Sequence, residues 1–154
     1  MKIETQKKTS PIEHIRELLN QNLPVEALEF IEHIGQKSPD IENARGVCLM
    51  RTGKINEAVV VLRDNIYKGH ICIPSDTPVL YKINFVTAMI LANNKEAAFP
   101  VLTRLNKNEH PYIAKLKDAV NQWVNSLSFF EKLRYKIGSY SDKPINIDFQ
   151  PGEI

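Results

Sequence analysis

The sequence predicts an all-α protein built from paired helices, on three observations. Through most of the 154 residues, apolar side chains recur at spacings of three and four, the period of an amphipathic helix. Most of the nine prolines stand at the joints between these segments, where proline starts one helix or stops another. Strand signals are weak, since the only alternating stretch before the tail, residues 70–74, is brief and ends at Pro74.

Composition places the chain among globular proteins with one core. Hydrophobic residues make up 43% and charged residues 25%, which excludes collagen-like, disordered and disulfide-scaffold classes. No apolar run is long enough to span a bilayer, and the net charge of +2 is too small to indicate nucleic-acid binding. Two cysteines, Cys48 and Cys72, cannot form a zinc site alone. Without an apolar leader near Met1, we expect a cytoplasmic protein.

The helical spacing assigns the elements in order. Six paired segments are expected, at residues 12–19, 27–34, 44–50, 58–66, 80–91 and 97–105. Ser10 is the expected N-cap of the first, with Glu13 as its capping-box partner. From 111 to 137 the apolar positions form one continuous stripe, which predicts a single long helix ended by Gly138. Residues 138–154 are expected to be an extended tail, because Ile145, Ile147 and Phe149 alternate with polar residues.

Three of the helical segments share a pattern anchored on an alanine. Ala27, Ala58 and Ala98 each precede large apolar residues, and their spacings are 31 and 40 residues. A small residue is needed where two helix backbones approach closely, so we expect these alanines to be buried at helix crossings. The longer spacing predicts an insertion at residues 68–77.

This pattern resembles the tetratricopeptide repeat (TPR) family, a helix–turn–helix repeated every 34 residues. The middle repeat matches best, with Gly46, Gly53, Ala58 and Leu62 at the family's small, turn, alanine and large apolar positions. The resemblance implies a right-handed α-solenoid in a domain of residues 1–137, with repeats at about 8–39, 40–69 and 78–109 and a capping helix at 111–137. The outer repeats depart from the family's pattern at Ile15, Val86 and Pro100, which stands within the last repeat's second helix.

In that family the first helix of each pair lines a groove that holds an extended peptide or a partner helix. Carried over by position, the expected groove combines an apolar row with polar anchors: Arg16, Leu19, Asn20, Asn43, Val47, Met50, Arg51, Ile83, Thr87 and Ile90. The carboxylate clamp of the chaperone-binding subgroup is absent, since Ile12, Arg16, Ala44, Leu80 and Asn84 occupy its positions. The expected function is non-catalytic protein binding, as an adaptor or scaffold, with no cofactor and no metal. Equally, these apolar residues could pack beneath the capping helix or the tail.

Two other functions stay open. A secretion-type or specialised chaperone would use the same groove. A small thiol or redox enzyme would centre on His70 and Cys72, since an imidazolium lowers the pKa of a nearby thiol. We favour an inert Cys72 buried beside Ile71 and Ile73, because the sequence has no phosphate loop, nucleophile elbow or zinc-protease motif.

The last predicted helix is basic and aromatic, which makes nucleic acid and a membrane surface two further candidate partners. Residues 104–136 carry seven Lys or Arg and three Asp or Glu, so Trp123, Phe129 and Tyr135 could stack on bases. Residues 126–138 could lie on a membrane surface through Phe129 and Phe130. We favour core packing of these aromatic residues and expect neither partner. The tail is instead expected to dock on its own protein, or on a second copy, through Ile145, Ile147 and Phe149.

Overall fold

The computed structural model describes residues 10–154 of this chain. The N-terminal segment used to argue against a leader, and the start of the first repeat at residue 8, lie outside the described residues. Within them there are eight helices and no strand, so the all-α class is confirmed. The helices are α1 Pro11–Asn20, α2 Pro24–Ile34, α3 Pro39–Arg51, α4 Ile55–Tyr67, α5 Val79–Leu91, α6 Lys95–Arg104, α7 Pro111–Ser126 and α8 Phe129–Lys136.

Local sequence signals account for most of the helix boundaries. Proline stands in the first turn of α1, α2, α3 and α7, where its missing N–H costs no helical hydrogen bond. At α1 the predicted capping box is present: the Glu13 amide donates to the Ser10 hydroxyl, and the Ser10 amide donates to the Glu13 carboxylate. The predicted insertion is confirmed as the connection between α4 and α5.

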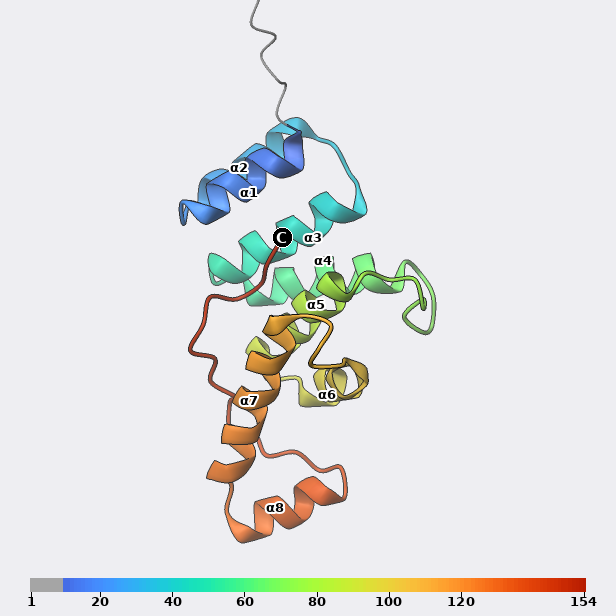
Figure 1. Ribbon diagram of the computed structural model, residues 1–154, viewed down its shortest axis with the longest axis vertical. Helices are drawn as coiled ribbons and strands as arrows, with labels where there is room; N and C mark the ends of the chain where they lie inside the picture. The colour runs from blue at the N-terminus through green and yellow to red at the C-terminus, as the bar shows by residue number, and fades with distance from the viewer. Residues whose placement is uncertain (1–9) are drawn as a thin grey trace, which may run out of the picture.

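Helices that follow one another in the sequence pack against each other, from α1 to α6 (Figure 1). Ala27, Ala58 and Ala98 are fully buried, as their spacing predicts. Gly46 lies where α3 crosses α4, and a Cβ there would overlap the Leu62 side chain. The close approach of these two helices therefore depends on a glycine facing a leucine.

The single helix expected at 111–137 is wrong, because the chain leaves the helix at Leu127 and restarts as α8. Leu127 has an extended backbone with ψ of 146°, and Ser128 is the N-cap of α8. The cause is a second capping box, in which Ser128 and Glu131 exchange hydrogen bonds between side chain and backbone. The continuous apolar stripe masked this local start signal.

The break leaves an apolar face of α8 uncovered. Phe129 and Phe130 are 76% and 75% exposed, and Leu133 and Ile137 are exposed as well. Core packing, expected for the aromatic residues of this region, is therefore wrong for Phe129. It is right for Trp123 on α7, which is 4% exposed.

After α8 the chain returns along one side of the stack, past α7, to end beside α3 (Figure 1). Along this path the Trp123 indole donates to the Lys143 carbonyl at 2.9 Å, and Ile145 is buried. Ile147 and Phe149 are half-buried, and the Phe149 ring packs edge-on against Tyr112 at 4.9 Å between centroids. The tail forms no strand, and its backbone bends at Phe149 and Pro151, before Gly152 with φ of +74°.

The crossing of α3 and α4 gives a direct test of packing. An alanine at a helical glycine normally stabilises by about 1 kcal/mol. Here we expect Gly46→Ala to lower the free energy of unfolding instead, by about 1–3 kcal/mol, because the new methyl group overlaps Leu62. Chemical denaturation measures this. In a Leu62→Ala background the same change should cost much less, and an equal cost in both backgrounds would refute the contact.

Candidate peptide-binding groove

The Arg51 guanidinium joins the end of α1 to the end of the tail. Its Nε donates to the Pro151 carbonyl at 3.1 Å and its Nη2 to the Gly152 carbonyl at 2.7 Å. Its Nη1 donates to the Leu19 carbonyl at 3.2 Å. Burial lowers the pKa of Arg51 below its usual value, but a guanidinium remains charged at neutral pH. These are therefore charge-assisted hydrogen bonds, stronger than neutral ones.

Asn84 on α5 binds both main-chain groups of one tail residue. Its Nδ2 donates to the Glu153 carbonyl at 2.7 Å, and its Oδ1 accepts from the Glu153 amide at 3.0 Å. The same Nδ2 donates to Oδ1 of Asn43 at 3.0 Å, across from α3. Both asparagines are buried. The pair thus fixes the orientation of the Asn84 amide, which is matched to an extended backbone and not to a particular side chain.

The Tyr112 hydroxyl, on α7, bridges two further main-chain groups of the tail. It donates to the Gln150 carbonyl at 2.9 Å and accepts from the Gly152 amide at 2.8 Å. Burial raises the pKa of Tyr112 to about 12, so the hydroxyl keeps its proton and can both donate and accept. At the far end, Arg16 Nε donates to the Ile154 carbonyl at 3.2 Å.

The residues expected in the groove are found in three settings. Arg16 and Arg51 bind the tail directly, and Val47 and Met50 lie beneath Gly152. Asn43 orients Asn84. Of the remaining five, Leu19, Ile83, Thr87 and Ile90 are buried, and Asn20 is exposed.

Two residues that hold the tail were missing from the expected groove. Asn84 occupies one of the positions of the TPR carboxylate clamp, where the family has a different residue, and the resemblance therefore implied no binding role for it. Tyr112 lies on the helix after the repeats, which was expected to act as a cap. A buried tyrosine needs a hydrogen-bond partner for its hydroxyl. This need was the signal that could have identified Tyr112 as a residue that binds another segment.

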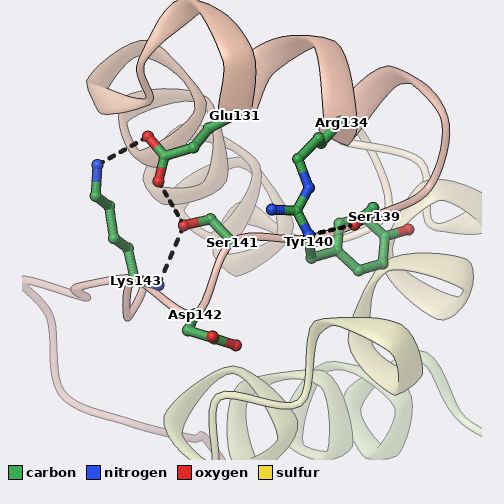
Figure 2. Close-up of a pocket in the computed structure, with 7 residues that line it drawn as sticks. All are labelled: Glu131, Arg134, Ser139, Tyr140, Ser141, Asp142 and Lys143. Carbon is green, nitrogen blue, oxygen red and sulfur yellow. Dashed lines mark hydrogen bonds and ion pairs between the residues drawn. The ribbon is translucent and has the colours of Figure 1, made fainter.

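A polar hollow between α8 and the start of the tail is shown in Figure 2, lined by Glu131, Arg134, Ser139, Tyr140, Ser141, Asp142 and Lys143. Glu131 accepts from Lys143 Nζ at 2.9 Å and from the Ser141 hydroxyl at 2.8 Å. Lys143 and the α8 capping box together lower the pKa of Glu131 from 4.5 to about 2. These bonds attach the tail to α8. Both oxygens of the Glu131 carboxylate accept structural hydrogen bonds.

The thiol alternative centred on His70 and Cys72 remains an untested prediction. Cys72 is exposed and Ile71 is 98% exposed, so the expectation of a buried Cys72 packed beside Ile71 is wrong. Cys48 is fully buried, and burial raises its pKa to about 12. Across residues 10–154, no three His, Cys, Asp or Glu side chains gather in a way that could hold a metal ion. Over the same residues, no helix has both the length and the apolar character needed to cross a membrane.

Comparison with family models, with curated proteins and with solved structures finds no match to this chain.

The fork of Arg51, the pair of hydrogen bonds that its guanidinium donates to the Pro151 and Gly152 carbonyls, yields a prediction for the end of the tail. Arg51→Lys keeps the charge but cannot reach both carbonyls in the same geometry. We expect the Gly152 and Glu153 amides to exchange with solvent about tenfold faster or more, the effect of losing one charge-assisted hydrogen bond. Hydrogen exchange read by NMR measures this, with Arg63→Lys on the exposed side of α4 as control. Unchanged protection of both amides would show that the fork does not hold the tail.

The lowered pKa of Glu131 yields a pH dependence. A carboxylate stabilised in the folded state contributes stability above its unfolded pKa of 4.5, and this is lost as pH falls towards about 2. Wild type should therefore be more stable than Glu131→Gln near neutral pH, and the two should converge near pH 2. Denaturation at several pH values tests this, with Glu57→Gln at an exposed site of α4 as control. A difference that does not change with pH would contradict the assignment.

Proposed function

We propose that this chain is a non-catalytic protein-interaction module, an adaptor or scaffold, that holds an extended peptide in a concave groove. The arrangement we infer is a TPR-like right-handed solenoid, with α1, α3 and α5 lining the groove and α7 adding Tyr112. The observation that carries the proposal is the mode of contact with residues 150–153. Arg51, Asn84 and Tyr112 bind this segment through its main-chain atoms.

Main-chain recognition supports a binding function because every peptide presents the same carbonyl and amide groups. Extended peptides bound in this way gain affinity from backbone hydrogen bonds, while a few pockets set the specificity. A tail needed only to complete the core would be expected to bury its own side chains. Here only the side chain of Ile145 is buried, while Ile147, Phe149 and Ile154 are half-buried against the edge of the core.

The tail is therefore the resident ligand of the groove in this proposal, and a partner replaces its last residues. Ordering each residue of an extended segment costs about 1–2 kcal/mol, which offsets much of what the contacts contribute. Exchange between the resident segment and a partner segment is consistent with this near balance. A specialised chaperone would use the same groove, with a less selective set of ligands.

Photo-crosslinking in the native host tests the proposal. A crosslinking residue placed at Arg16, where the tail ends, should capture a partner protein. The same residue placed at Val60, 48% exposed on α4, serves as control. Adducts should form at Arg16 and not at Val60, and they should decrease when Asn84→Ala removes the main-chain contact. Equal adducts at both positions, or adducts that are insensitive to Asn84, would contradict the proposal.

A further inference from the structure

We infer that the groove selects one class of peptide, a segment that turns at a glycine seated at the deepest point and continues with an acidic residue. This inference rests on the proposed function and names the ligand. The partner's segment would take the place of residues 150–154, whose sequence is Gln-Pro-Gly-Glu-Ile.

The requirement for glycine comes first from the floor of the groove. Gly152 is buried, and a Cβ on it would lie 2.8 Å from Cγ2 of Val47 and 2.8 Å from Cε of Met50. The Met50 methyl group could move aside, but Val47 is β-branched, fully buried and on the rigid α3 helix. A second Val47 carbon, Cγ1, lies at 3.1 Å from the same point. Any side chain at this position of a ligand would therefore overlap the methyl groups of Val47, which cannot move away.

The backbone conformation selects glycine independently. Gly152 has φ of +74°, a region that residues with a side chain rarely adopt. This conformation turns the two carbonyls of Pro151 and Gly152 to the same guanidinium, and it points the Gly152 amide at the Tyr112 hydroxyl. A ligand residue that cannot reach this conformation would lose these bonds together.

The neighbouring positions are restricted by different groups. The residue before the glycine uses only its carbonyl, so a proline, which has no amide hydrogen, fits there without loss. At the next position the Glu153 carboxylate lies 3.4 Å from Nε2 of His110, and Arg51 adds positive charge nearby. A carboxylate is favoured at this position. Gln150 is exposed, and its Nε2 donates to Oδ1 of Asn22 at 3.1 Å.

A peptide titration of the full chain tests this selectivity. Gly152→Ala in the chain should release its own residues 150–154 and open the groove. Glu153→Pro provides a second opened chain, because it removes the amide hydrogen that Glu153 donates to Oδ1 of Asn84. The probe is a synthetic peptide of residues 149–154, compared with the same peptide carrying alanine at position 152. Binding is followed by NMR through the side-chain amide signal of Asn84, and circular dichroism checks the fold.

The glycine peptide should bind the opened chains about tenfold tighter or more than the alanine peptide, the penalty expected for an overpacked contact. It should bind wild type more weakly, because the resident segment competes, and Arg51→Ala in an opened chain should abolish binding. Equal affinity of the two peptides, or full protection of residues 150–154 in the Gly152→Ala chain, overturns the selectivity but leaves the proposed function standing. No binding of either peptide to either opened chain overturns both.

Discussion

The Arg51 guanidinium is the interaction on which the arrangement of the tail depends. It bonds both to the helical stack, at Leu19 of α1, and to two carbonyls of the tail. A half-buried cation is costly unless its donors are satisfied, and the main-chain carbonyls supply the acceptors. The tail and Arg51 therefore stabilise each other: without the tail, two N–H groups at the floor of the groove would need water or another peptide.

Most of the helical framework could be predicted from the sequence because its causes are local. Proline in the first turn, a capping serine and a three-four apolar spacing act within a few residues of one another. The same reasoning wrongly predicted α7 and α8 as one helix, because the unbroken apolar stripe was given more weight than the capping box at Ser128 and Glu131. A capping box in the middle of a stripe is therefore stronger evidence for a break than the stripe is for continuity.

The contacts that hold the tail were predicted only in part, and the reason is physical. Spacing along a helix shows which face a residue occupies, so Val47, Met50 and Arg51 could be assigned to the groove. Whether a residue on that face is open or covered depends on chain segments that are distant in sequence. Asn84 and Glu153 are 69 positions apart, and no periodicity links them. The tail's own pattern indicated that it would dock, but the site of docking is encoded in hydrogen-bonding groups of single residues.

The order in which the chain is synthesised gives this topology a kinetic consequence. Contacts between successive helices are short in sequence, so α1 to α6 can pair as they emerge from the ribosome. The contact between Arg16 and Ile154 spans 138 positions and cannot form until Ile154 has been synthesised. During translation, the apolar floor at Val47 and Met50 is complete before the segment that covers it exists. For that interval Val47 and Met50 lack the cover that Gly152 gives them in the complete fold.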